Sequence, residues 1–386
     1  MKKLVSLALV LMLCLLSVGA MAEGGVPVEE LKVGFIFIGD ENEGYTANHY
    51  NGAKEMAAAL GLSESQLLIK WVVPENEECE DAAYDLADQG CQIIFGNSFG
   101  FESYMINVAK EYPDVEFCHA TGTQASTLGM ANFHNFFTSV YESRYVSGVV
   151  AGMKLNEMIA NGVITEDQAK IGYVGAFPYE EVKSGYTAFF LGARSVCPSA
   201  TMDVKYTNSW ASFDLEKEAA EALIAGGCVL ISQHADTTGA PTACEEAGVP
   251  VVGYNVSMIA TAPTQALTSA AVNWGPYYTY AVQCIVDGTE IVTDWCHGYA
   301  DGANQITELN EAAVAEGTAE KVAEVEAALA DGSLHVFDCS TFTVGGATLT
   351  EADSEYISDG YFHESEVRSA PYFGYVIDGI TELTAQ

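Results

Sequence analysis

Residues 31–38 read Leu-Lys-Val-Gly-Phe-Ile-Phe-Ile, an almost unbroken apolar run. Because side chains alternate between the two faces of a strand, such a run is typical of a strand buried on both faces. A helical pattern follows over 43–61 and ends at a glycine, and a second β-rich run covers 67–73. Strand, helix and strand in this order, with short joints, predict a parallel sheet covered by helices on both faces.

The alternation of strands and helices continues along the chain in two blocks. The first block adds helical patterns over 76–90 and 101–112 and strands over 91–95 and 115–119. The second block has helices over 144–161, 179–197, 215–226 and 237–248, and strands over 170–175, 201–208, 228–233 and 249–254. A strand over 266–271 and a helix over 276–287 come next.

We therefore predict an α/β protein with two doubly wound parallel-sheet lobes. The N-terminal lobe is expected to comprise 23–143 and about 266–330, and the C-terminal lobe 144–265 and about 331–386. Two such lobes that share one chain are joined by a hinge, and they form a ligand cleft at the carboxyl ends of their strands.

The composition excludes several classes of protein. The chain has 386 residues, and 49% of them are hydrophobic, which excludes a disordered protein. It carries 15 basic and 53 acidic residues, a formal net charge of −38. Such a charge repels phosphate backbones and anionic lipids, so we expect no nucleic-acid partner. It indicates a soluble, self-repelling chain, and a monomer is expected.

Residues 1–22 have the pattern of a secretory signal peptide. Lys2 and Lys3 precede an apolar run over 4–16, and Ala20-Met21-Ala22 fits the small-x-small rule for cleavage. We predict cleavage near Ala22 and an extracytoplasmic mature protein. A lipid anchor at Cys14 is disfavoured because the preceding Leu13 is bulky for a lipoprotein signal.

Nine cysteines follow the predicted cleavage site, and none has Cys-x-x-Cys spacing. That spacing would indicate a zinc ribbon or a thioredoxin-like motif, so we expect no metal site. Cys91, Cys118 and Cys228 lie in apolar, strand-like runs, which favours buried free thiols. Cys296 and Cys339 lie in the less regular C-terminal part and are the pair we expect to form a disulfide, if any pair does.

The residues that follow the predicted strands are the candidates for ligand contacts. In the first block they are Asp40, Glu43, Tyr45, Asn97, Ser98, His119 and Thr121, and in the second block they are Trp210, Phe213, His234, Asp236, Asn255 and Asn273. The set contains no Lys or Arg, so a phosphate would have no counter-charge. Aromatic rings with amides and carboxylates suit a flat heterocycle, and they would also suit a neutral sugar.

Several of these residues have an equally simple structural interpretation. Asp236 can be the N-cap of the following helix, and His119 can be a hydrogen-bonded core histidine. Tyr45 and Trp210 can each be a packing residue. The functional interpretation gains support because polar and aromatic residues recur at the same topological place in both blocks.

An enzyme is the alternative from another class. Gly96-Asn97-Ser98-Phe99-Gly100 fits the Gly-x-Ser-x-Gly nucleophile elbow of α/β-hydrolases between a strand and a helix. A secreted serine hydrolase would use Ser98 with a later histidine such as His335 or His363. The doubled lobe pattern and the absence of an early His-Gly-Gly-type loop in the sequence argue against this alternative.

Motifs along the mature sequence occur in the order and spacing of a known family. Three of them are Ile94-Phe-Gly-Asn-Ser-Phe-Gly-Phe101, Gln233-His-Ala-Asp236 and Asn273-Trp-Gly-Pro-Tyr-Tyr278. The chain resembles the basic membrane protein family of ABC-transporter substrate-binding proteins, which includes purine nucleoside receptors. The resemblance implies a type I periplasmic-binding-protein fold with a purine-type ligand between the lobes.

The resemblance also implies roles for individual residues. The base would lie between Tyr45 and Trp210, with Phe213 as a rival to Trp210, and Asn97, Ser98 and the turn over 119–122 would face its edge. Nucleoside-binding members hold ribose with an Asp and a Lys, where this chain has Asn255 and Asn273. A free base such as adenine is therefore favoured over a nucleoside, and a sugar receptor of the same fold is the alternative.

The resemblance further implies a binding protein rather than an enzyme, with no cofactor. The lobes would close on the ligand by a hinge, and the closed form would dock on a membrane ABC permease.

Overall fold

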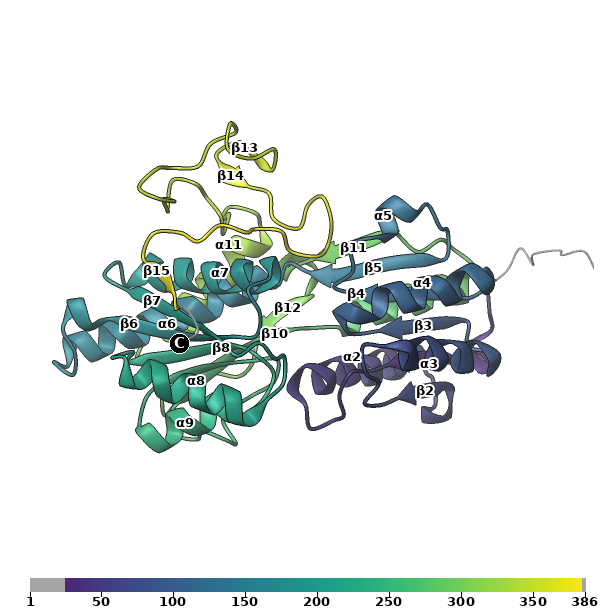
Figure 1. Cartoon of the computed structure of the whole chain (residues 1–386), viewed down its shortest axis with the longest axis horizontal. Helices are drawn as coiled ribbons and strands as arrows, with labels where there is room; N and C mark the ends of the chain where they lie inside the picture. The colour runs from purple at the N-terminus through teal and green to yellow at the C-terminus, as the bar shows by residue number, and fades with distance from the viewer. Residues whose placement is uncertain (1–24, 384–386) are drawn as a thin grey trace, which may run out of the picture.

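The computed structural model describes residues 25–383 and consists of two α/β lobes side by side (Figure 1). The first lobe has a six-stranded, all-parallel sheet in the order β11-β5-β4-β3-β1-β2. Its strands are β1 (Val33–Ile36), β2 (Leu67–Lys70), β3 (Ile93–Gly96), β4 (Glu116–Ala120), β5 (Phe133–Thr138) and β11 (Asp294–His297). The predicted parallel sheet is confirmed.

Helices cover both faces of this first sheet. On one face α2 (Gly44–Leu60) packs beside α10 (Gly275–Asp287), and their apolar residues share a core with Phe35 and Phe95. On the other face α3 (Glu77–Asp88), α4 (Glu102–Glu111) and the short α5 (Ala125–Leu128) form a second core. A sheet covered on both faces explains why its strands read as continuous apolar runs.

The second lobe has a seven-stranded sheet in the order β12-β10-β9-β8-β6-β7-β15. All its pairs are parallel except β10 with β12. Its strands are β6 (Lys170–Gly175), β7 (Thr201–Tyr206), β8 (Leu230–His234), β9 (Val251–Tyr254), β10 (Ala266–Val272), β12 (Asn304–Ile306) and β15 (Ile380–Glu382). Its helices are α6 (Val140–Ala160), α7 (Glu180–Val196) and α11 (Thr318–Ala330) around one core, and α8 (Phe213–Ala225) and α9 (Gly239–Ala247) around another.

The chain crosses between the lobes three times, over 138–140, 272–275 and 297–304. The expected assignment of 266–330 to the N-terminal lobe therefore needs correction. Only α10 and β11 belong to that lobe, whereas β10 pairs with β9, and β12 and α11 also pack in the C-terminal lobe. A buried apolar run such as β10 identifies a strand, but the run does not specify which sheet the strand joins.

The segment after α11 belongs to the C-terminal lobe, as expected. Phe337, Phe342 and Phe373 lie in the core formed by α6 and α7, and β15 pairs with β7. The rest of the segment, drawn in yellow, folds over α11 and α7 (Figure 1).

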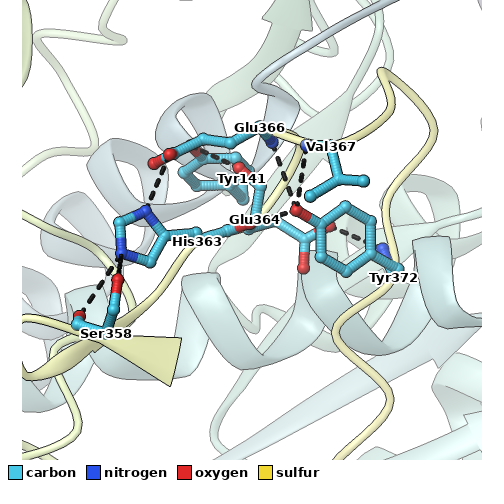
Figure 2. Close-up of polar contacts among 7 residues, drawn as sticks. All are labelled: Tyr141, Ser358, His363, Glu364, Glu366, Val367 and Tyr372. Atoms are coloured by element: carbon cyan, nitrogen blue, oxygen red, sulfur yellow. Dashed lines mark hydrogen bonds and ion pairs between the residues drawn. The ribbon is translucent and has the colours of Figure 1, made fainter. Parts of the chain in front are cut away.

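Polar contacts hold this segment to the lobe (Figure 2). The Tyr141 hydroxyl donates to the Glu364 carbonyl oxygen over 3.3 Å, and Tyr372 N donates to Glu364 Oε1 over 2.6 Å. His363 lies between Ser358 Oγ and Glu366 Oε2, with 2.7 Å from the ring nitrogens to each.

All nine cysteines among residues 25–383 are free, and eight of them are buried. The expected disulfide between Cys296 and Cys339 is wrong, because Cys296 lies on β11 of the first lobe and Cys339 in the core of the second. Cys91, Cys118 and Cys228 are buried thiols, as predicted.

The predicted signal peptide and Cys14 lie outside the described residues. Within residues 25–383, none of the helices combines the length and the hydropathy that crossing a membrane requires.

We predict that Gly148→Ala destabilises the second lobe, because α6 and α7 approach each other through glycines. A Cβ at Gly148 would lie 2.0 Å from the Phe189 carbonyl oxygen, and one at Gly192 would lie 2.0 Å from the Tyr145 carbonyl oxygen. Overpacking of this kind costs about 1–3 kcal/mol of unfolding free energy, measurable by urea denaturation. Gly374→Ala is the control, since its nearest contact would be an ordinary 3.6 Å. Equal midpoints for the two variants would contradict the prediction.

Candidate functional site

A cavity of about 670 Å³ lies between the lobes at the carboxyl ends of their strands. The first lobe lines it with Ile38, Gly39, Glu43, Tyr45, Asn97, Ser98, Phe99 and Thr121. The second lobe lines it with Glu181, Trp210, Ala211, Asp236 and Tyr254. Its position is the one that the topology predicts for a ligand site.

The two lobes touch each other at the rim of this cavity. Gly44 N, at the start of α2, donates to the Asp236 carbonyl oxygen over 3.2 Å. A Cβ at Gly44 would approach that oxygen to 3.0 Å, so glycine permits the contact. The rings of Phe99 and Tyr179, from opposite lobes, have centroids 6.2 Å apart. The structure therefore represents a closed arrangement of the lobes.

Hydrogen bonds fix the wall that the first lobe contributes. Glu43 caps α2, since its carboxylate accepts from Tyr45 N over 2.7 Å and from Thr46 N over 2.9 Å. The Tyr45 hydroxyl donates to the Asn97 carbonyl oxygen over 2.7 Å. Asn97 Oδ1 in turn accepts from Ile38 N over 2.9 Å. These bonds tie the end of β1, the start of α2 and the end of β3 into one rigid surface.

The second lobe contributes an aromatic and acidic wall. Trp210 packs against Phe177 and Tyr179, with ring centroids 5.4 and 6.1 Å away. Asp236 Oδ1 accepts from Asn255 Nδ2 over 2.8 Å. Asn255 adopts the left-handed conformation, with φ of 65°, which an asparagine tolerates better than most residues.

Carboxyl groups of both lobes meet in the cavity, and their charges change one another's pKa. Burial raises the pKa of Glu181 to about 7. The pKa of Asp236 is raised well above its usual value, first by burial and then by the nearby charges of Glu43, Glu216 and Glu181. Burial, with a smaller contribution from Asp40, also raises the pKa of Glu43. Ligand groups that donate hydrogen bonds or carry positive charge would complement this site.

Seven of the predicted site residues line the cavity, and they come from both lobes. They are Glu43, Tyr45, Asn97, Ser98, Thr121, Trp210 and Asp236. The described residues that line the cavity include no Lys or Arg, as the sequence predicts for these positions.

Two predicted residues do not reach the cavity because they point into solvent. Asp40 is exposed and accepts from Asn42 N over 2.8 Å in its own turn. Phe213 begins α8 and is 43% exposed. The aromatic ring in this wall is therefore that of Trp210 and not that of Phe213.

Four further predicted residues lie behind the walls or at the hinge. His119 is buried and contacts the Ser98 carbonyl oxygen through Nε2 over 2.7 Å. His234 is buried against Tyr254, with ring centroids 4.9 Å apart. Asn255 supports Asp236, as described above. Asn273 donates to the Gly302 carbonyl oxygen over 2.9 Å and so joins two crossing segments instead of facing the ligand cavity.

The predicted site residues do not include six others that line the cavity, namely Ile38, Gly39, Phe99, Glu181, Ala211 and Tyr254. Tyr254 is the last residue of β9, and Phe99 follows β3 by three positions. Glu181 lies in the first turn of α7, after the loop that follows β6. Applying the carboxyl-end rule to β6 and extending it into the first helical turn would have found Glu181.

The geometry at Ser98 differs from the Ser–His arrangement that the hydrolase alternative requires. Ser98 Oγ donates to Glu75 Oε1 over 2.6 Å, and none of the described histidines has a ring nitrogen within hydrogen-bond distance of this oxygen. A nucleophilic serine needs a base that accepts its proton, as in the Ser–His pair. Of the two proposed partners, His363 instead contacts Ser358 and Glu366 in the C-terminal segment, and His335 stacks on Tyr361.

Comparisons with known proteins agree with this description. The family model described as "ABC transporter substrate-binding protein PnrA-like" matches residues 32–333. A purine-binding protein of Brucella abortus is 34% identical over 321 residues, which is 83% of this chain and 87% of that protein. A putative ABC transporter glucose-binding protein of Haloferax volcanii is 33% identical over 271 residues, which is 70% of this chain and 65% of that protein.

Solved structures of solute-binding proteins share the fold. One from Conexibacter woesei has a TM-score of 0.65 at 22% identity and covers 79% of this chain and 98% of its own. One from Aeropyrum pernix has a TM-score of 0.66 at 16% identity and covers 80% of this chain and 93% of its own. The fold is thus the type I periplasmic-binding-protein fold, as predicted.

We predict that Glu181 and Glu216 lower the free energy of unfolding as pH rises from about 5.5 to about 8. Folding raises the pKa of Glu181 and of Glu216 from 4.5 to about 7. At these two groups the folded state holds more protons than the unfolded state in this window, so their contribution to stability is lost as pH rises through it. Burial lowers the pKa of His49, His119 and His234, and these groups act in the opposite direction below about pH 6.5. Urea denaturation therefore compares the natural protein with the double variant Glu181→Gln, Glu216→Gln, and the loss between the two pH values should be larger in the natural protein by about 4 kcal/mol.

High salt is the control for this measurement. Salt at about 1 M screens repulsion among exposed charges but acts little on buried carboxyls, so most of the pH dependence should persist. The same pH dependence in the natural protein and in the double variant at high salt would contradict the assignment to these two buried groups.

Proposed function

The chain belongs to the family of PnrA-like ABC transporter substrate-binding proteins, and we propose that it binds a purine base in the cleft and delivers it to an ABC permease. The observation that carries the proposal is that Tyr45 of one lobe and Trp210 of the other line the same cavity. Rings from two sides can stack on both faces of a flat heterocycle. The purine-binding relative from Brucella abortus supports the same ligand class.

The polar lining supports a base more than a phosphorylated nucleotide. Carboxylates of Glu43, Glu181 and Asp236 offer acceptors for ring N–H and amino groups, and Asn97 and Ser98 add groups of mixed character. A phosphate would meet carboxyl groups there and no cationic side chain among the described lining residues. For this reason we propose an unphosphorylated ligand.

We propose the free base rather than the nucleoside. Asn255 uses its amide group on Asp236, and Asn273 lies outside the cavity. Neither position therefore provides the carboxylate or the ammonium group that would hold a ribose in nucleoside-binding members of the family.

The proposed mechanism is closure of the lobes on the ligand, without catalysis and without a cofactor. A ligand that contacts both lobes favours the closed arrangement, because only there are both aromatic walls engaged. The three crossing segments over 138–140, 272–275 and 297–304 would act as the hinge. The closed form would then dock on the permease outside the cytoplasm, where the signal-like residues 1–22 would direct the chain.

A sugar is the second candidate ligand. The glucose-binding relative from Haloferax volcanii favours it, and aromatic rings with carboxylates are also compatible with a neutral sugar. The ligand panel described next distinguishes the two candidates.

We predict that the mature chain, refolded free of carried-over ligand, binds adenine at least about tenfold more tightly than adenosine and shows no saturable binding of glucose. Isothermal titration calorimetry measures all three affinities. Tighter binding of adenosine would refute the free-base proposal and keep the purine class. Saturable binding of glucose alone would replace the purine proposal with the sugar receptor.

We predict that Trp210→Ala weakens adenine binding by about 1–3 kcal/mol, because it removes one stacking face. Phe213→Ala is the matched control: it also removes an aromatic ring near the cleft, but Phe213 is exposed and does not line the cavity. Its affinity should equal that of the natural protein. Equal losses in the two variants would show that the assignment of the stacking residue is wrong.

A further inference from the structure

Arg144 is a buried cation behind the cavity wall of the second lobe. It lies near the start of α6, at the first crossing between the lobes, and has no exposed surface. Its Nη1 donates to the Gln233 carbonyl oxygen over 2.7 Å, and among the described residues Nε and Nη2 have no partner. The guanidinium carbon lies 3.6 Å from the centroid of the Tyr254 ring.

This arrangement is costly for a residue with a purely structural role. A buried guanidinium normally pairs with a carboxylate through several hydrogen bonds, and Arg144 forms no ion pair within the described part of the chain. The side chain also fills space between α6 and α7, since a Cβ at Gly185 of α7 would lie 3.6 Å from Arg144 Nε. A neutral residue of similar length would keep most of this packing and remove the buried charge, so it is expected to be tolerated.

The charge of Arg144 acts on groups that line the cavity. It opposes the effect of burial on Glu181 and Asp236 and lowers the pKa of each. It likewise lowers the pKa of Tyr254, and it adds to burial in keeping His234 neutral. Arg144 itself does not line the cavity, whereas Glu181, Asp236 and Tyr254 do.

We propose that Arg144 is a positioning residue for ligand binding. From behind the wall it supports the ring of Tyr254 and favours the ionised forms of Glu181 and Asp236, so that the second lobe selects a base that presents ring N–H and amino donors. This inference rests on the proposed function, and it specifies which edge of the base the second lobe recognises.

The inference predicts the direction in which the affinity for adenine changes with pH. Protonation of Glu181, whose pKa burial raises to about 7, removes an acceptor, so affinity for adenine should rise with pH and then level off. The titratable and charged groups around Glu181 are Arg144, His234, Asp236, Tyr45, Tyr173 and Tyr254. Removing the positive charge of Arg144 should move the midpoint of this rise to higher pH.

The test compares Arg144→Met, Arg144→Lys and Glu181→Gln with the natural protein. Adenine is titrated calorimetrically at about pH 5.5, 7 and 8.5, and the melting temperature is recorded without ligand. The natural protein should bind about tenfold more tightly at the highest pH than at the lowest, and Glu181→Gln should show little pH dependence. Arg144→Met should bind about tenfold more weakly at pH 7, with a midpoint at higher pH and an unchanged or higher melting temperature. The adenine affinity and the pH midpoint of Arg144→Lys should lie between those of the natural protein and those of Arg144→Met.

A second readout does not need a ligand. Carbon-13 NMR of the Glu181 carboxyl, assigned by its loss in Glu181→Gln, should show a higher pKa in Arg144→Met. If that variant does not fold, Arg144→Gln, which also removes the charge, takes its place in both measurements, and Arg144→Lys remains the control that keeps the charge but changes the stacking on Tyr254.

Two results would overturn the inference. The first is a Glu181 pKa that is unchanged in Arg144→Met, whether or not a base binds. The second is a lower melting temperature with an unchanged pH midpoint of affinity, which is the signature of a structural role. If the pKa rises but no purine binds at all, the proposed function fails, and the selection of a base by this wall fails with it.

Discussion

The contact between the start of α2 and Asp236 brings carboxyl groups of two lobes into one cavity, and the rest of the site depends on that juxtaposition. Glu43 comes from the first lobe and Glu181 and Asp236 from the second, and the buried Glu216 acts on Asp236 from behind the wall. Like charges at short range oppose closure in a buried site, where screening is weak. A ligand that donates hydrogen bonds to these groups offsets the repulsion only when the lobes are closed. Electrostatics and stacking thus favour the same state, which couples ligand recognition to lobe movement.

The part of the chain beyond the family match adds to the second lobe rather than forming a separate unit. The match ends at residue 333, yet Phe337, Phe362 and Phe373 lie in the core with α6 and α7. One backbone contact reaches the other lobe, since Ser369 N donates to Asp294 Oδ2 on β11 over 3.1 Å. Removing the segment would expose the core of the lobe that carries Trp210 and Asp236, so an effect of truncation on binding would say little about the cleft itself.

The sequence predicts the strands that are apolar and misses those with polar residues inside. The strand β6 has the bounds that the pattern indicates, whereas β5 was missed because His134 and Asn135 interrupt its apolar run. Both are buried and bonded, His134 to Glu116 over 2.8 Å and Asn135 to the Ala125 backbone over 2.8 Å. A sequence pattern carries no signal for such distant partners, and tertiary structure decides these positions.

The sequence likewise predicts some residues of the site and misses others. Residues one or two positions after a strand, such as Asn97 and Asp236, were found because parallel strands end at one edge. Asn273 also follows a strand, but β10 ends where the chain crosses between lobes, so the rule fails there. No rule of position predicts the layer behind the wall, where Arg144, Gln233 and His234 have buried polar atoms without a hydrogen-bond partner among the described residues. Such atoms also occur elsewhere in the described core, for example at Trp274 and Tyr277, so these three residues are distinguished by their place behind the cavity and not by being unpaired. Core packing alone would favour apolar residues there, and a polar layer directly behind a binding wall is where a fold is expected to give up stability for function.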